Sequence, residues 1–223
     1  MNMKKIASAL CIAFAVAVPA YAKTLTIDLA TLPASATNLT SLLSIQQFDP
    51  TLGTLTGIEI DYSSLLKTDV TLKGVNTVPN KKVTVNAIGS ISLKRPDASL
   101  VAPVSTATLI SAAPFTVNGK ETITGITGSN TLSIYALLDG ASDLALFTGT
   151  GSLTSLFSAQ VNVTGAGAAG VLTSFNSTAT GYGKVVYTYT AAPVPEPETY
   201  GMLLLGLGVV GFAAKRKSRA AKV

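Results

Sequence analysis

Apolar and polar residues alternate with a period of two in short runs through most of the chain. The alternation is clear in residues 24–29, 58–62, 83–85, 91–93 and 185–189. Alternate residues of a strand point to opposite faces, so this pattern predicts strands with one face in a core and the other in solvent. Between the two ends of the chain, no long run has the 3.6-residue period of a helix.

Turn residues separate the predicted strands. Asn118-Gly119 lies between the alternating residues 115–117 and 122–124, and it is the strongest hairpin signal in the chain. Residues 165–170 contain only Gly and Ala, which predicts a loop. Many short strands with Gly, Asn, Asp and Pro between them favour an all-β fold, an antiparallel β-sandwich, and a jelly-roll variant fits equally well.

The first 22 residues have the three regions of a secretory signal peptide. Two lysines precede an apolar run over residues 6–18, and the small residues Ala20 and Ala22 suit signal peptidase. We therefore predict export by the secretion machinery and cleavage before Lys23. An uncleaved membrane anchor is disfavoured, because the apolar run is shorter than the roughly 20 residues that a spanning helix needs.

Residues 193–223 contain a proline-acid-proline motif, an apolar run and a basic cluster, in that order. The parts are Val194, Pro195, Glu196 and Pro197, then Tyr200 to Ala214, then Lys215, Arg216 and Lys217. The prolines favour an extended backbone that a protease can bind in a cleft. The apolar run predicts a single transmembrane helix, and the basic cluster predicts a cytoplasmic end, with the domain outside.

This tail resembles the PEP-CTERM sorting signal of exopolysaccharide-producing Gram-negative bacteria. The resemblance implies transient anchoring in the inner membrane and processing by an exosortase, a membrane cysteine protease or transpeptidase. It also implies that the product is secreted to the extracellular matrix or cell surface. A plain C-terminal transmembrane anchor after a proline-rich linker is the alternative. Residues 194–200 lack the Leu-Pro-any-Thr-Gly pattern of a Gram-positive sortase signal.

Residues 48–56, FDPTLGTLT, resemble the opening of choice-of-anchor domains, which are β-rich modules often found upstream of this sorting tail. Residues 188–190 resemble the ending of those domains. The resemblance covers two patches and implies a domain class only. We therefore expect a signal peptide over 1–22, a β-sandwich surface domain over 23–192 and a sorting tail over 193–223.

Charge and composition exclude several functions. The formal net charge is +5, but the basic excess lies at the two ends, so we expect no nucleic-acid partner. The chain has no histidine, and its one cysteine, Cys11, lies in the predicted signal peptide. The mature chain therefore lacks the common nucleophile–base pairs and the imidazole or thiolate metal sites. We expect no catalytic residue, no cofactor and no metal.

Carboxylates and tyrosines are the remaining candidates for chemistry. Glu59 and Asp61 share a strand face and would suit a glycosidase only if another strand brought a partner carboxylate near, so a solvated face is favoured. Residues 139–143 supply oxygens within one turn but lack the acid density of a calcium loop, so a self-capped turn is favoured. Tyr187 and Tyr189 share a face that could stack sugars, but a buried core face is favoured.

The leading hypothesis is a non-enzymatic exported protein that associates with extracellular polysaccharide, as in a biofilm matrix. The alternative is a carbohydrate-binding lectin, or a glycosidase using acidic residues, held by a plain transmembrane anchor. Polysaccharide as a partner is implied by the family resemblance and not by the residues.

Overall fold

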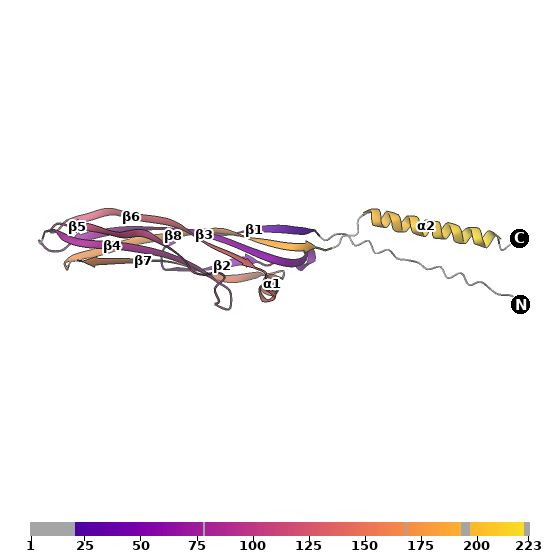
Figure 1. Cartoon of the computed structure of the whole chain (residues 1–223), viewed down its shortest axis with the longest axis horizontal. Helices are drawn as coiled ribbons and strands as arrows, with labels where there is room; N and C mark the ends of the chain where they lie inside the picture. The colour runs from indigo at the N-terminus through magenta and orange to yellow at the C-terminus, as the bar shows by residue number, and fades with distance from the viewer. Residues whose placement is uncertain (1–20, 78, 168, 193–196, 221–223) are drawn as a thin grey trace. The chain divides into compact units, whose positions relative to one another are not determined.

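The computed structural model describes residues 21–77, 79–167, 169–192 and 197–220. They fall into two compact units, of which one is Ala22–Thr190 and the other contains helix α2, Pro197–Ala220 (Figure 1). The elements of the first unit are β1 (Ala22–Ala36), β2 (Leu39–Gln46), η1 (Pro50–Leu52), β3 (Gly53–Gly74), β4 (Lys81–Lys94), β5 (Ser105–Val117), β6 (Thr122–Leu138), α1 (Ala141–Phe147), β7 (Ser152–Gly167) and β8 (Val171–Ala191).

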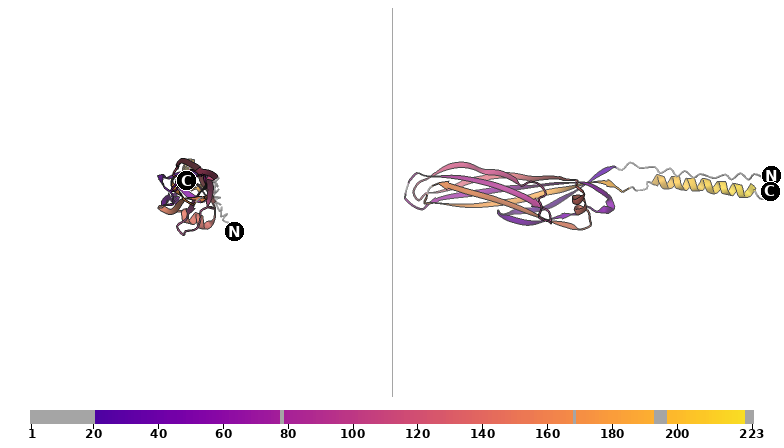
Figure 2. Two further views of the ribbon diagram at one scale, coloured as in Figure 1. Left: turned by 90° about the vertical axis from the view of Figure 1, so that its left-hand side faces the viewer. Right: turned by 60° about the horizontal axis from the view of Figure 1, so that its bottom comes forward.

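The strands form two four-stranded sheets, which we call sheet A, in the order β1-β8-β3-β6, and sheet B, in the order β2-β7-β4-β5. The sheets are antiparallel and pack face to face as a sandwich (Figure 2). The chain changes sheet at every connection between consecutive strands except that between β4 and β5. The predicted all-β antiparallel sandwich is confirmed.

The core lies between the inner faces of the two sheets, where alternate strand residues point. On β3, every second residue from Ile58 to Val70 is buried. The buried serine and threonine of this row have partners, since the Ser64 hydroxyl donates to the carbonyl of Thr180 and the Thr68 and Ser177 hydroxyls lie 2.7 Å apart. Each fully buried aliphatic or aromatic side chain contributes about 1.5–3 kcal/mol through the hydrophobic effect.

The turn at Asn118-Gly119 forms, but the hairpin predicted from it is wrong. β5 pairs with β4 and β6 pairs with β3, so the turn carries the chain from one sheet to the other. Gly119 has a φ of 58°, and the Asn118 side chain accepts a hydrogen bond of 3.0 Å from the backbone of Asn80. The dipeptide fixes a chain reversal, whereas strand partners depend on which faces the rest of the chain buries.

Two other local features differ from the sequence prediction. The Gly/Ala run is not a loop throughout, because β7 continues to Gly167 and Gly165 pairs with Val85. Helix α1 was not predicted, since it has only seven residues and cannot show a helical period over several turns. Pairing with β4 thus overrides the low strand preference of Gly and Ala.

Helix α2 contains the predicted apolar run of the tail. Pro197 is its first residue, a position where the missing N–H costs no helical hydrogen bond. Large apolar side chains are exposed along the helix, namely Met202, Leu203, Leu204, Leu205, Leu207, Val209, Val210 and Phe212.

Within the ranges given above, no helix is long and apolar enough to cross a membrane. Helix α2 continues beyond the uncharged run into the basic cluster. The transmembrane helix expected over Tyr200–Ala214 stays a prediction.

Gly74→Ala should destabilise the sandwich by about 1–3 kcal/mol, because the new Cβ would overlap the carbonyl oxygen of Gly119 in the sheet-crossing turn. Gly57→Ala is the matched control on the same strand, since the nearest atom to its Cβ would be 3.8 Å away. Urea unfolding of both variants measures the difference. Equal midpoints would contradict the close packing of the β3 end against the turn.

Candidate functional site

The tyrosine pair predicted on the last strand belongs to the core. Tyr187 is fully buried, and its hydroxyl donates a 2.6 Å hydrogen bond to the carbonyl of Gln46. Its ring centroid lies 5.9 Å from that of Phe48, and the half-buried ring of Tyr189 lies 5.0 Å from Phe48. These two rings therefore pack the inside of the sandwich and offer no platform for a sugar, as the favoured interpretation predicted.

The Phe-Asp-Pro patch is also structural. Phe48 is fully buried, while the Asp49 carboxylate caps η1 by accepting a 2.9 Å hydrogen bond from the backbone N–H of Thr51. That hydrogen bond lowers the pKa of Asp49 below its ordinary value. The patch anchors the loop between β2 and β3 to the core and leaves no free reactive group there.

The acidic turn at residues 139–143 leads into α1. Both oxygens of Asp143 bind Arg95, at 2.9 Å from Nε and 3.3 Å from Nη2, so this carboxylate is occupied by a two-point ion pair. Among the residues whose placement is described, no group of three or more His, Cys, Asp or Glu side chains could hold a metal ion. The segment folds as a turn and a helix start.

Glu59 and Asp61 lie on the outer face of sheet A, on the solvent side of β3. Their direct neighbours on β6 are Leu137 and Tyr135, which are 67% and 56% exposed. Desolvation raises the pKa of Tyr135 first, and the Glu59 and Asp61 carboxylates beside it raise the pKa further. The two acids thus face an exposed aromatic ring, and no carboxylate of a neighbouring strand opposes them as a glycosidase pair would require.

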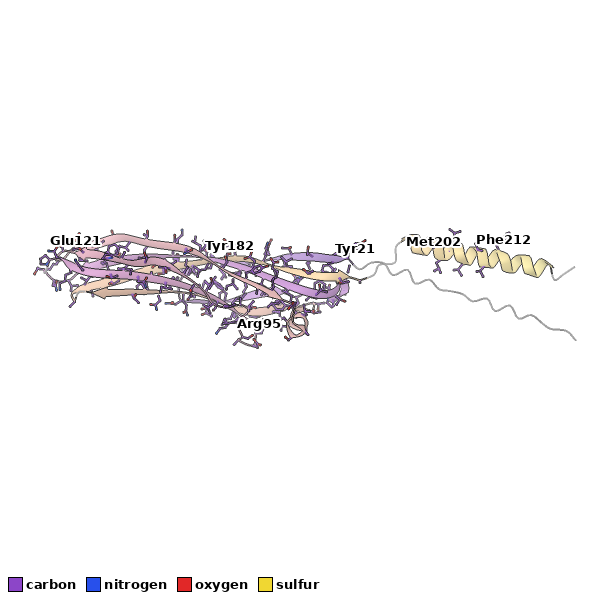
Figure 3. The ribbon with its side chains drawn as sticks, in the orientation of Figure 1. Tyr21, Arg95, Glu121, Tyr182, Met202 and Phe212 are labelled. Carbon is purple, nitrogen blue, oxygen red and sulfur yellow. The ribbon has the colours of Figure 1, made fainter. Side chains whose placement is uncertain are left out.

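A shallow hollow of about 440 Å³ opens on the same face, where β1, β8 and β3 meet. Its lining combines two carboxylates, an ammonium, a hydroxyl and an aromatic ring, from Asp28, Asp61, Lys184, Ser63 and Tyr182, with Leu29, Thr31 and Gly183 completing it. Tyr182 is 52% exposed, and Figure 3 shows it near the middle of the sandwich, away from Glu121 at one end. Ligand pockets of about 300–1,000 Å³ are typical.

The charged groups of the hollow are not paired with one another. Asp28 and Lys184 are register partners on β1 and β8, and Asp61 lines the same hollow from β3. In the part of the chain that the structure describes, the one salt bridge within 4.0 Å is that of Arg95 with Asp143. The ammonium and both carboxylates therefore keep their hydrogen-bonding capacity.

Sequence reasoning missed Tyr135 and Tyr182, although a signal for both was present. Leu132, Ile134 and Ala136 are the inward residues of β6, so the residues between them, including Tyr135, face outward. Tyr182 stands between Gly181 and Gly183, in a strand whose inward residues are odd-numbered. The strand phase alone places both rings on the surface of sheet A.

The predicted processing sites lie only in part within the described residues. Ala22 and Lys23 form the start of β1 and pair with Thr190 and Tyr189 near the end of β8. Ala20, and with it the signal peptide predicted over 1–22 except for its last two residues, lies outside the described residues. Val194, Pro195 and Glu196 also lie outside them, and Pro197 begins α2.

Residues 193–217 match the family model described as the PEP-CTERM protein-sorting motif. The tail is a PEP-CTERM sorting motif. A PEP-CTERM motif implies an exported protein that is processed by exosortase. No family is found for the β domain, so its resemblance to choice-of-anchor domains stays a prediction. No curated protein matches the chain.

Comparison with solved structures finds viral proteins at low identity and low TM-score. A structure of infectious bursal disease virus, Gx strain, is 13% identical with a TM-score of 0.21, over 77% of this chain and 37% of that chain. The T13 particle of the same virus is 11% identical with a TM-score of 0.26, over 84% and 46%. Desmodium yellow mottle tymovirus is 11% identical with a TM-score of 0.21, over 88% and 94%. The chain spans less than half the length of the bursal disease virus chains.

Tyr187→Phe should destabilise the sandwich by about 1 kcal/mol, because it leaves the carbonyl of Gln46 without its donor. Tyr62→Phe is the matched control, since the Tyr62 hydroxyl is buried with no hydrogen-bond partner among the described residues. Removal of that hydroxyl should leave stability unchanged or raise it. Urea unfolding near pH 7 compares the variants, and a larger loss for Tyr62→Phe would contradict this assignment.

The Tyr62→Phe variant also tests how stability depends on pH. Burial raises the pKa of Tyr62 to about 12 from 10.0. The unfolded chain loses this proton first, so the contribution of Tyr62 to stability is complete below about pH 10 and is lost as the pH rises toward 12. Stability measured across this interval should fall less steeply in Tyr62→Phe than in the unaltered chain, and identical slopes would contradict the shift.

Proposed function

We propose that this chain is a non-enzymatic surface protein of a Gram-negative bacterium, whose β-sandwich is delivered to an extracellular polysaccharide matrix after exosortase has cut the tail. The observation that carries this proposal is the match of the sorting motif over residues 193–217. Signal peptidase would act at the other end of the domain, before Lys23.

The geometry of the sandwich suits two cuts. The start of β1 pairs with the end of β8, from Ala22 opposite Thr190, so both ends of the domain are held by one strand pair. Cleavage before Lys23 would remove one residue of β1, and the motif begins after β8 has ended at Ala191. All eight strands would therefore remain after processing.

The apolar side chains of α2 explain why the tail is removed from the product. A helix with apolar residues on all sides is stable in an apolar environment, and α2 exposes such residues from Met202 to Phe212 (Figure 3). We therefore place α2 transiently at the inner membrane, where exosortase acts. Cleavage leaves the apolar side chains of α2 at the membrane and releases the β-sandwich to the extracellular matrix.

A structural role is supported by the interactions of the acidic residues in the loops, which bind groups of the protein itself. Asp143 binds Arg95, Asp49 caps η1, and Asp97 accepts hydrogen bonds from Ser99 within its own turn. The strand acids Glu59 and Asp61 sit beside a tyrosine and a leucine and not beside a second acid on the next strand. A lectin remains the second candidate, since the hollow at Tyr182 combines an exposed ring with free polar groups.

Pro195→Ala combined with Pro197→Ala should prevent processing, because it removes the restricted backbone of the motif while keeping the apolar residues of α2. We expect the full-length chain in the cell fraction and none in the medium, as in a host without exosortase. Fractionation and immunoblotting measure this. Pro96→Ala combined with Pro103→Ala, at exposed loop positions, is the control and should be processed normally. Normal release of the motif variant would favour the plain-anchor alternative.

A further inference from the structure

We infer that the outer face of sheet A is a binding site for an uncharged polysaccharide, with the hollow at Tyr182 as its main subsite. The inference deepens the proposed function and rests on it for the source of the glycan. Two exposed tyrosines lie on this face, and Asp28, Asp61 and Lys184 of the hollow form no salt bridge with one another, which the fold of a purely structural sandwich does not require.

The hollow arises from backbone features on two neighbouring strands. The register of β1 against β8 shifts between Leu29 and Leu32, which leaves Ala30 and Thr31 without register partners opposite Tyr182. On β8, Gly181 and Gly183 flank Tyr182, and a Cβ on either would strike the Tyr62 ring. The glycines make room for the buried Tyr62 ring on the inner face, while the bulge on β1 lies opposite Tyr182 on the outer face, where Asp28 and Lys184 line the same hollow.

The polar groups of the hollow match the chemistry of sugar hydroxyls. The carboxylates of Asp28 and Asp61 can accept hydrogen bonds, the ammonium of Lys184 can donate them, and charge-assisted bonds of this kind are the strong ones. The ring of Tyr182 supplies an apolar surface for the C–H face of a sugar. Such a mixture of one aromatic surface with a few placed polar groups is typical of small-molecule sites.

Tyr135 extends the face toward β6. Asp61 links the two tyrosines, since it lines the hollow with Tyr182 and is the direct neighbour of Tyr135. β8 and β6 lie on either side of β3, so the strands that carry the two rings are two strand spacings apart, about 10 Å. A chain of several sugar units can therefore touch both rings, which favours a polysaccharide over a single sugar.

Charge decides which polysaccharide fits. Around the two rings, Asp28, Glu59 and Asp61 outnumber Lys184, so this part of the face is net negative and would repel a chain of uronic acids. The four strands of sheet B contain no Asp or Glu, so the hollows on that side lack ionised acceptors. An uncharged glycan on sheet A satisfies both observations.

Affinity electrophoresis of the full-length chain tests this, in a detergent without a sugar headgroup, with dextran, laminarin, galactomannan or alginate in the gel. At least one of the three uncharged polysaccharides should retard the chain, and alginate should not. Tyr182→Ala should weaken that binding roughly tenfold, and Asp61→Asn should weaken it severalfold without loss of folding. Phe175→Ala is the matched control, because Phe175 is 51% exposed but lines a different hollow.

The inference is overturned if none of the uncharged polysaccharides retards the chain, if alginate alone does, or if Phe175→Ala and Tyr182→Ala weaken binding equally. The test is independent of processing, since the tail stays on the chain. Normal processing without glycan binding would overturn this inference alone. Glycan binding by a chain whose tail is never cut would overturn the proposed sorting and leave the binding site standing.

Discussion

The pairing of β1 with β8 is the interaction on which the rest of the structure depends. It joins the first and last strands of the domain, with Ala22 opposite Thr190. β1 itself buries little, since Leu29 is its only fully buried residue in the described range. Its place in the sheet therefore rests on the hydrogen-bond ladder and on half-buried Leu25, Ile27 and Leu32.

The same pairing shapes the candidate site and protects an edge. β1 is an edge strand, and edge strands invite pairing with other chains unless bulges or prolines interrupt them. β1 has both devices, with register shifts on either side of Leu32 and with Pro33 next to it. The first register shift, between Leu29 and Leu32, also lies opposite Tyr182 at the hollow. The bulge that interrupts the edge strand therefore also borders the exposed ring.

The sequence was sufficient for the strands and their faces, because alternation is a local property of each strand. It predicted the inward side of β3 and the buried place of Tyr187. It could not supply strand partners, which depend on contacts between distant segments, and the Asn118-Gly119 hairpin failed for that reason. The hollow at Tyr182 was missed because it needs a bulge on β1, a strand far from β8 in the chain. The tail was readable because its motif is linear.

The central claim is that the β-sandwich alone, freed from both ends of the chain, is the working form of this protein. Intact-mass spectrometry of the protein recovered outside the producing cells tests the claim most directly. The account predicts one species that begins at Lys23 and ends near Pro197, so that it retains β1 to β8 and lacks α2. Extracellular protein that still extended to Val223 would contradict the account.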